Sequence, residues 1–197
     1  MPILEPEALI RHLDQGGVIA FPTDTVTALA TRPEQAERLY DLKQRDRRKP
    51  LILLGANAND LWPYVEADAT ARTLAAHHWP GALTLVLPSR HPVTATMNPG
   101  GGQSLGLRVP DSDLARQLLA RTGPLATTSA NRSGEPPLMT VAALLSGFPE
   151  VAILEGFEQQ LMSGAPSTVV RCTPEGLQVL RQGAVIIPAT LDPLRIS

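Results

Sequence analysis

Residues 18–25, Val18-Ile19-Ala20-Phe21-Pro22-Thr23-Asp24-Thr25, join a short apolar run to a polar one. The run 18–21 predicts a buried strand because it is short, apolar and closed by a proline. The residues before it predict a helix over 5–15, with Pro6 in its first turn and Gly16-Gly17 after its end. A helix that leads into a buried strand is the first indication of an α/β domain.

The same kinds of pattern recur along the rest of the chain. Helices are expected over 33–45, 67–79, 111–121 and 140–146, with Asp111 and Thr140 at the starts of the last two. Further strands are expected over 51–54, 83–87, 104–109, 125–128, 151–154, 167–172 and 177–181. Helices and strands alternate early and strands cluster late, which favours an α/β or α+β domain of three layers around a mixed sheet.

Two stretches lack a periodic pattern. Residues 91–103 contain the run PGGG and are expected to form a loop. We expect the domain to span residues 1–186 and residues 187–197 to be a C-terminal tail.

Composition narrows the class of protein. The 197 residues suit about one domain, the formal net charge is −2, and 43% of the residues are hydrophobic. The single Cys172 excludes an intramolecular disulfide. The N-terminus does not resemble a signal peptide, and no apolar run has the length of a membrane span, so we expect a cytoplasmic protein without a membrane partner. The global charge does not require a nucleic-acid partner.

Three hydroxyl-rich segments lie at the ends of expected strands. They read PTDTVT at 22–27, TTSANRSG at 127–134 and SGAPST at 163–168. Hydroxyls and backbone amides at strand ends can hold phosphate oxygens or a zwitterionic ligand. Serine and threonine also make ordinary turns, so one such segment alone would decide nothing. Three of them in one domain favour a binding site.

Five of the 17 lysines and arginines fall within residues 43–49, KQRDRRK, between an expected helix and an expected strand. Guanidinium groups suit phosphate oxygens, whereas a run of charges is more often a solvated turn. In a chain of net charge −2, this concentration slightly favours an anion site.

Other polar residues leave alternatives open. Arg108 and Arg181 lie inside expected strands, so each either faces a ligand or forms a strand-end ion pair. His77-His78 lacks the spacing of a zinc site, and Cys172 predicts a packed thiol. The sequence contains neither a P-loop nor a dinucleotide-binding glycine motif, so any phosphate would be bound in another way.

Taken in order, these segments resemble the YrdC/TsaC family. The matches are PTDT at 22–25, LKQR at 42–45 with KPL at 49–51, WPGALT at 79–84, LRVP at 107–110, TSANRSG at 128–134, STVV at 167–170 and LRQG at 180–183. Each match is short, but their order over nearly the whole chain is specific. The chain is similar to the short, single-domain form of this family.

The resemblance implies a twisted α/β domain with a mixed sheet and a deep concave cleft. It implies a nucleotidyltransferase that condenses L-threonine, bicarbonate and ATP to L-threonylcarbamoyl-adenylate and pyrophosphate, with Mg²⁺ accompanying the ATP. A partner transferase complex would then move the threonylcarbamoyl group to an adenosine of tRNA. Contact with tRNA or other double-stranded RNA through the basic segment 43–49 is a further expectation.

By position, the resemblance also implies roles for individual residues. Threonine would be held by Thr25, Arg108 and Ser167. Lys43 and Arg45 would face the triphosphate and act as the catalytic cations. The nucleotide side would be completed by Lys49, Ser104, Ser129, Asn131 and Arg181. No side chain is assigned to a metal, and positioning with charge stabilisation would carry the reaction.

Two positions depart from the family pattern. Thr27 and Ala28 stand where an aromatic residue followed by glycine is usual, and Leu54 stands where longer relatives often carry a histidine. Loss of an aromatic wall would alter the choice of amino acid. The alternatives are a paralogue that binds RNA or a nucleotide without adenylate synthesis, and a protein-interaction domain, which leaves the grouped hydroxyls and arginines unexplained.

Overall fold

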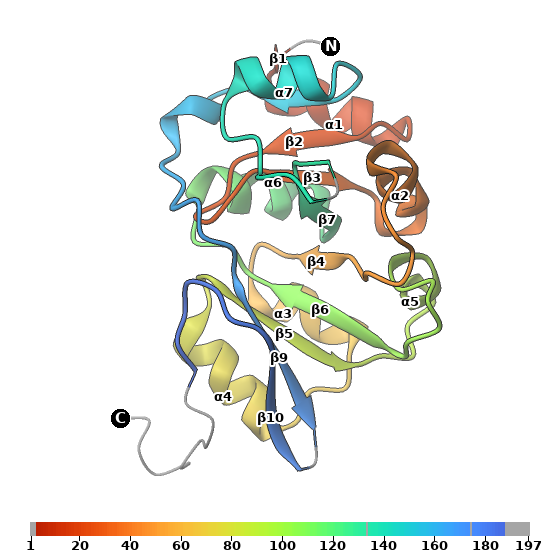
Figure 1. Cartoon of the computed structure of the whole chain (residues 1–197), viewed down its shortest axis with the longest axis vertical. Coiled ribbons are helices and arrows are strands. Elements are labelled where there is room, and N and C mark those ends of the chain that lie inside the picture. Colours follow the sequence, from red (N-terminus) through yellow and green to blue (C-terminus); the bar gives the residue numbers. More distant parts are fainter. Residues whose placement is uncertain (1–2, 133, 174, 188–197) are drawn as a thin grey trace.

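The computed structural model describes residues 3–132, 134–173 and 175–187. Its strands are β1 (Ile3–Leu4), β2 (Ile19–Phe21), β3 (Ala28–Thr31), β4 (Ile52–Leu54), β5 (Leu83–Pro88), β6 (Ser104–Arg108), β7 (Leu125–Ser129), β8 (Ala152–Leu154), β9 (Thr168–Thr173) and β10 (Gly176–Arg181). Within the described residues these form one mixed sheet in the order β1-β8-β2-β3-β7-β4-β6-β5-β9-β10. Figure 1 shows β1 at one end of the molecule and the β9–β10 hairpin at the other.

Helices cover this sheet. They are α1 (Pro6–Asp14), α2 (Glu37–Lys43), α3 (Ala58–Leu61), α4 (Ala69–His78), α5 (Val93–Met97), α6 (Asp113–Thr122) and α7 (Val141–Gly147), with 3-10 turns at Pro33–Gln35, Trp62–Tyr64 and Phe157–Gln159. None of the helices in the described part of the chain is long and apolar enough to cross a membrane.

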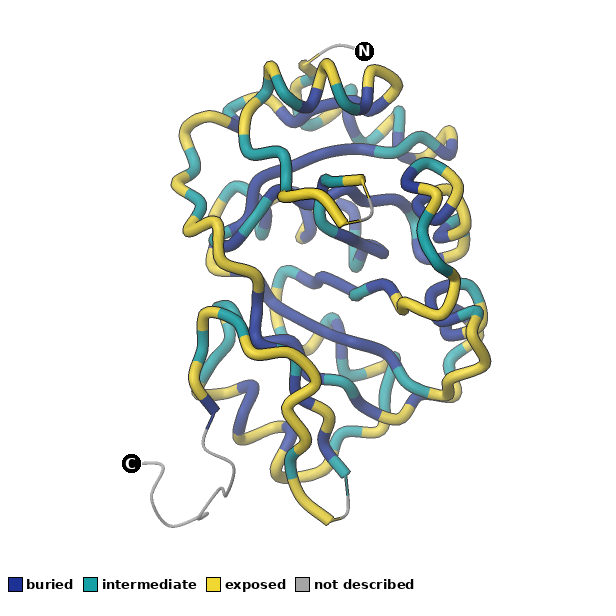
Figure 2. The backbone as a smooth tube through the Cα atoms, viewed as in Figure 1, coloured by how far each residue is buried: buried dark blue, intermediate teal, exposed yellow. Residues whose placement is uncertain are grey.

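Two separate apolar clusters show that the sheet is buried on both faces. Ile19 and Phe21 of β2 pack with α1 and α6 in one cluster, whereas Ala20 between them packs with α2 in the other. Successive side chains of a strand point to opposite faces, so each cluster marks one helix-covered face. Figure 2 shows the central strands as buried. The expected α/β fold with three layers is confirmed.

Strand pairing brings the hydroxyl-rich segments together. The antiparallel pair β3–β7 places Ala28 opposite Ser129, so residues 22–27 run past the end of β7. The parallel pair β4–β6 places Leu54 beside Arg108. The parallel pair β5–β9 places Leu83 beside Thr168, which directly follows Ser167. The ends of β6 and β7 and the start of β9 therefore border one region of the sheet.

The structure corrects several expectations about the elements. Residues 91–103 are not wholly a loop, because they contain α5, whose Val93 and Met97 are buried. The cap of α6 is Ser112 rather than Asp111, since the Ser112 side chain accepts from the amide of Ala115. Residues 188–197 of the expected tail lie outside the described residues. Ile187, its first residue, is buried against the core.

Candidate active site

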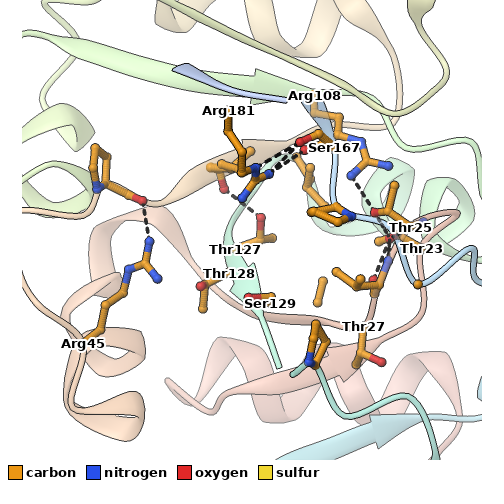
Figure 3. A pocket seen from close by; sticks show the side chains of 18 residues that line it. Thr23, Thr25, Thr27, Arg45, Arg108, Thr127, Thr128, Ser129, Ser167 and Arg181 are labelled. Carbon is orange, nitrogen blue, oxygen red and sulfur yellow. Dashed lines mark hydrogen bonds between the residues drawn. The ribbon is translucent and has the colours of Figure 1, made fainter. Parts of the chain in front are cut away.

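The three hydroxyl-rich segments meet around one cavity of about 230 Å³. Figure 3 shows Thr23, Thr25 and Thr27 on one side of it and Arg45 on the opposite side, with Arg108 and Arg181 close to Ser167. Its lining residues are Thr23, Thr25, Val26, Thr27, Ala28, Arg45, Pro50, Ile52, Leu54, Arg108, Thr127, Thr128, Ser129, Pro137, Gly164, Pro166, Ser167 and Arg181. Among them are three arginines and no carboxylate, so the cavity is suited to an anion.

Arg108, at the end of β6, is fixed by three hydrogen bonds and is 5% exposed. Its Nε donates to the carbonyl oxygen of Gly81 at 2.8 Å, Nη1 to Thr25 Oγ1 at 2.8 Å, and Nη2 to Asp24 Oδ1 at 2.6 Å. A guanidinium has five N–H groups. One N–H on each terminal nitrogen therefore has no partner among the described residues. Such a pair can bind the two oxygens of a carboxylate.

Asp24 is the counter-ion that makes the burial of Arg108 tolerable. Its Oδ1 also accepts from the amide of Asp111 at 3.0 Å, which ties the strand-end segment to the turn before α6. Thr25 is positioned from the same segment, because Thr23 Oγ1 lies 3.0 Å from Thr25 Oγ1 and accepts from the Thr25 amide at 3.2 Å. Arg108 thus both faces the cavity and belongs to an ion pair, the two possibilities that its sequence left open.

Ser167 and Arg181 form a second polar wall. Ser167 Oγ lies 2.9 Å from Thr84 Oγ1 and accepts from Arg181 Nη2 at 3.1 Å. Arg181 also donates from Nε and Nη2 to the Ser167 carbonyl at 3.1 and 2.8 Å. No carboxylate of the described residues pairs with Arg181. Its Nη1 remains available to a ligand.

The basic segment 43–49 divides into two groups. Arg45 lines the cavity and donates to the carbonyls of Lys49 and Pro50, each at 3.0 Å. Arg47 instead pairs with Glu37 at 3.0 Å, and Arg48 pairs with Asp46 at 2.7 Å. Acidic neighbours thus neutralise Arg47 and Arg48, whereas Arg45 faces the cavity.

Charge and burial act together on the arginines of the cavity. Burial is the main cause that lowers the pKa of Arg45 and of Arg108, and the charge of Arg181 lowers the pKa of both further. An arginine pKa starts so high that the group stays charged near neutral pH. Three mutually repelling cations around one cavity are stabilised when an anionic ligand enters.

Lys43, at the C-terminus of α2, lies behind the wall formed by Thr128 and Ser129 and is 3% exposed. Its Nζ contacts Thr128 Oγ1 at 3.1 Å, the Ser129 carbonyl, and Asn131 Oδ1 at 3.1 Å. Burial, followed by the charge of Arg45, lowers the pKa of Lys43 to about 7. Lys43 therefore differs from the arginines in being able to lose its charge near neutral pH.

Six of the residues expected in the site line the cavity: Thr25, Arg45, Arg108, Ser129, Ser167 and Arg181. Lys43 and Asn131 do not line the cavity but contact its lining from behind. Asn131 Oδ1 accepts from Ser129 Oγ at 2.6 Å and from Lys43 Nζ at 3.1 Å. Lys49 and Ser104 do not line it: Lys49 is exposed, and Ser104 begins β6, the strand that has Arg108 at its far end. Any role for these two lies outside this cavity.

Sequence reasoning did not assign Thr23, Thr127, Thr128 or Asp24 to the site. The three threonines lie in hydroxyl-rich segments, which was the signal that could have found them. Asp24 lies in the same segment as Thr23, but its pairing with Arg108 could be seen only in the structure.

The two departures from the family pattern lie on the cavity wall. Thr27 and Ala28 line the cavity, and Thr27 is fully buried with Oγ1 3.7 Å from Met162 Sδ. Leu54 also lines it. Where an aromatic residue is usual, this chain has a small side chain beside a flexible thioether.

The histidine and cysteine residues lie away from the cavity. The described residues contain no group of three or more His, Cys, Asp or Glu side chains arranged to hold a metal ion. Cys172 is a buried thiol on β9, and burial raises its pKa to about 11. The prediction of a packed thiol is confirmed.

Comparison with known proteins gives consistent results. The sequence model of the Sua5/YciO/YrdC family, described as "Telomere recombination", matches residues 11–183. A threonylcarbamoyl-AMP synthase from Vibrio parahaemolyticus is 37% identical over 186 residues, which are 90% of this chain and 98% of the relative. A protein of the same name from Chromohalobacter salexigens is 39% identical over 153 residues, which are 75% of this chain and 82% of the relative.

Solved structures are similar in fold. P. abyssi Sua5 complexed with L-threonine has a TM-score of 0.85 and 28% identity, over 93% of this chain and 57% of that one. E. coli YciO has a TM-score of 0.83 over 97% and 99% of the two chains, and at 21% identity it supports the fold alone. The match of the family model and the identity to full-length relatives establish that the chain belongs to the Sua5/YciO/YrdC family.

Proposed function

We propose that this chain is a threonylcarbamoyl-AMP synthase, a nucleotidyltransferase that joins L-threonine, bicarbonate and ATP into L-threonylcarbamoyl-adenylate and releases pyrophosphate. The observation that carries the proposal is a single cavity with two chemically different ends. Arg108 lines one end and keeps N–H groups that could take a carboxylate, and Arg45 lines the other end, where a second anion could bind. Curated relatives that match most of the chain bear the name of this enzyme.

Threonine would bind at the end formed by Thr25, Arg108 and Ser167. The two free N–H groups of Arg108 would take its carboxylate, and the hydroxyls of Thr25 and Ser167 would orient the bound molecule. P. abyssi Sua5 is a relative whose structure contains L-threonine. The threonine site of this chain is our assignment.

ATP would bind with its triphosphate toward Arg45 and Arg181, close to Ser129. Lys43 and Asn131 would support that wall from behind, and Mg²⁺ would enter as part of the Mg–ATP substrate. Lys49 and Ser104 would contact the nucleotide only where it extends beyond the cavity. A triphosphate offsets the repulsion among the arginines that line the cavity.

The reaction would proceed by positioning and charge stabilisation. The threonine amine attacks the carbon of carbon dioxide derived from bicarbonate, forming an N–C bond and losing a proton to give a carbamate. A carbamate oxygen then attacks the α-phosphorus of ATP, and the bond to the pyrophosphate oxygen breaks. Arg45 and Lys43 would stabilise the charge that develops on the departing pyrophosphate. No covalent enzyme intermediate is needed.

The test is pyrophosphate release from ATP, measured with and without L-threonine and bicarbonate, with the product identified by mass spectrometry. We expect release that requires both co-substrates and a product with the mass of threonylcarbamoyl-AMP. Lys43→Ala and Arg45→Ala should both reduce it strongly, whereas Arg47→Ala, which removes a surface ion pair, should not. Full activity in both of the first two variants would reject the assigned roles.

The second candidate is a paralogue of the same fold that binds RNA or a nucleotide without making the adenylate. It is favoured by Thr27, which occupies the usual place of an aromatic wall. ATP binding without threonine-dependent pyrophosphate release would support it.

Cytoplasmic action on a tRNA pathway, with a transferase complex as downstream partner, belongs to the same proposal. Direct contact with tRNA or double-stranded RNA has weaker support, because Arg47 and Arg48 are paired with acidic side chains. A steep loss of RNA binding with salt would be its signature.

A further inference from the structure

Lys43 is the unusual charged group of the site. It is 3% exposed, and the oxygens that contact its Nζ belong to a hydroxyl, a peptide carbonyl and an amide. All three are neutral. No carboxylate among the described residues bonds to it. A buried ammonium without an opposite charge is unstable relative to the neutral amine.

Arg45 is the charged side chain that acts on the Lys43 pKa, whereas the nearby Asp41 and Asp46 pair with Arg47 and Arg48. Arg45, two residues on, lowers the Lys43 pKa, and Arg132 approaches the end of the same helix, donating from Nη1 to the Leu42 carbonyl at 3.1 Å. The elements packed against Nζ, β7 and the turn after it, contribute Thr128, Ser129 and Asn131, which do not titrate. The protein itself thus disfavours the charge that a phosphate-binding lysine needs.

The hydrogen-bond partners of Lys43 accommodate either protonation state. An ammonium donates three hydrogen bonds, one to each oxygen. A neutral amine donates two, to the Ser129 carbonyl and Asn131 Oδ1, and its lone pair accepts from the Thr128 hydroxyl, which can act as donor or acceptor. The side chain can therefore change its charge without leaving its place.

We propose that Lys43 is neutral in a large fraction of the empty enzyme and takes up one proton from solvent when the triphosphate of ATP binds. This inference rests on the proposed function, since it takes the anion beside Ser129 to be ATP. The added proton gives Lys43 a positive charge when the negative charge of the phosphates arrives nearby. The cost of holding a bare cation in the empty site is thereby avoided.

Among the described groups at the cavity, Lys43 is the one that can take up a proton near neutral pH. Neither histidine nor carboxylate is among its described lining residues, and its three arginines stay protonated. A phosphate with a second pKa near 6 is already ionised above pH 7.5. With the Lys43 pKa lowered to about 7 in the empty site, Lys43 is neutral in most molecules at pH 8.

The experiment is calorimetric titration of the protein with Mg–ATP at pH 8, without threonine, in buffers of different ionisation enthalpy. The slope of observed enthalpy against buffer enthalpy gives the number of protons exchanged. We expect uptake of between about half a proton and one proton, and an affinity that falls by up to about tenfold per pH unit between pH 7.5 and 9. Lys43→Arg should bind ATP without uptake, because arginine does not lose its proton. Arg47→Ala, an exposed change in the same segment that removes only surface ion pairs, should retain the uptake.

Each outcome decides the matter. ATP binding with no proton uptake in the wild-type protein would overturn the inference and leave the proposed function intact, as would uptake that persists in a folded Lys43→Arg. No ATP binding at all would reject both. If Lys43→Arg does not fold, the proton number of the wild-type protein and its retention in Arg47→Ala remain decisive.

Discussion

Arg108 is the residue whose replacement should separate threonine binding from ATP binding. Its guanidinium is held by Gly81, Thr25 and Asp24, and it is positioned to bind a carboxylate with its remaining N–H groups. In Arg108→Lys the fork of two N–H groups is lost, with one or two charge-assisted bonds of about 1.5–3 kcal/mol each. The KM for threonine should rise about 10- to 100-fold, with the KM for ATP changed less than about threefold, measured by pyrophosphate release.

The control for this variant is Arg171→Lys, an exposed change on β9 that should alter neither constant. Circular dichroism should show Arg108→Lys to be folded, because lysine keeps a positive charge beside Asp24. A rise in both KM values together would point to a general loss of structure, and an unchanged KM for threonine would remove Arg108 from its site.

Thr27 decides how much space the cavity has beside Thr25. Among the described residues, its one side-chain hydrogen bond is to Met162 Sδ at 3.7 Å, which is a weak one. We expect Thr27→Val, a change of similar volume, to keep the KM for threonine within about threefold, because only this weak bond is lost. Thr27→Phe should raise that KM at least about tenfold, since extra atoms in a fully packed wall displace Met162 or the ligand.

Steady-state kinetics with threonine and with smaller amino acids would measure both effects. If Thr27→Phe instead lowered the KM for threonine, the small residue at position 27 would weaken threonine binding rather than shape the pocket for it.

At the residue scale, the sequence alone could identify the segments that form the site, but not which residues of each segment face the cavity. The run 43–49 shows the reason. Arg45 and Arg47 look equivalent in the sequence, yet Arg45 lines the cavity whereas Arg47 turns to Glu37 and Asp41 on the surface. Which arginine finds a carboxylate depends on the turn after α2, where Gln44 has a positive φ of 50°.

At the scale of elements, the start of α6 couples stability to the site. Ser112 Oγ accepts from the Ala115 amide at 3.2 Å and donates to Gln160 Oε1 at 2.9 Å, so it caps the helix and ties it to the segment before β9. Ser112→Ala should lower the free energy of unfolding by about 1–2 kcal/mol. Thr140→Ala, at the more exposed cap of α7, should cost no more than about 1 kcal/mol.

Urea unfolding of both variants gives the comparison. Asp111→Ala tests whether Asp111 rather than Ser112 caps the helix. Asp111 is hydrogen-bonded through its backbone amide, which donates to Asp24 Oδ1 and which the substitution keeps. A loss for Asp111→Ala larger than that for Ser112→Ala would restore Asp111 as the cap.

Apolar strands could be predicted from sequence even where they are short, as in β2, β4 and β8, whereas β3 and α5 could not. The expected helix over 67–79 and strand over 83–87 correspond to α4 and β5. β3 was missed because Ala28–Thr31 has only one large apolar residue, Leu29, beside a threonine-rich turn, and it is a strand through pairing with β2 and β7. α5 was missed because proline and glycine surround a single helical turn.

At the scale of the whole molecule, the cavity is built by strands that are distant in sequence and joined by one sheet. Thr25 precedes β3, Arg108 ends β6, and Ser167 precedes β9. Order along the chain does not give these distances; they follow from the pairing β3–β7–β4–β6–β5–β9. A ligand that touches all three segments binds only when this part of the sheet is folded.

Threonine should therefore stabilise the folded molecule as a whole. A ligand present at 100 times its Kd, bound only to the native state, adds about 2.7 kcal/mol to the free energy of unfolding. For a chain of this length, the Tm should rise by about 5–10 °C. Differential scanning calorimetry with and without threonine measures the shift, and Arg108→Lys at the same threonine concentration should lose most of it. An equal shift in both proteins would mean that threonine binds elsewhere, because Arg108 is the only part of the site that the variant changes.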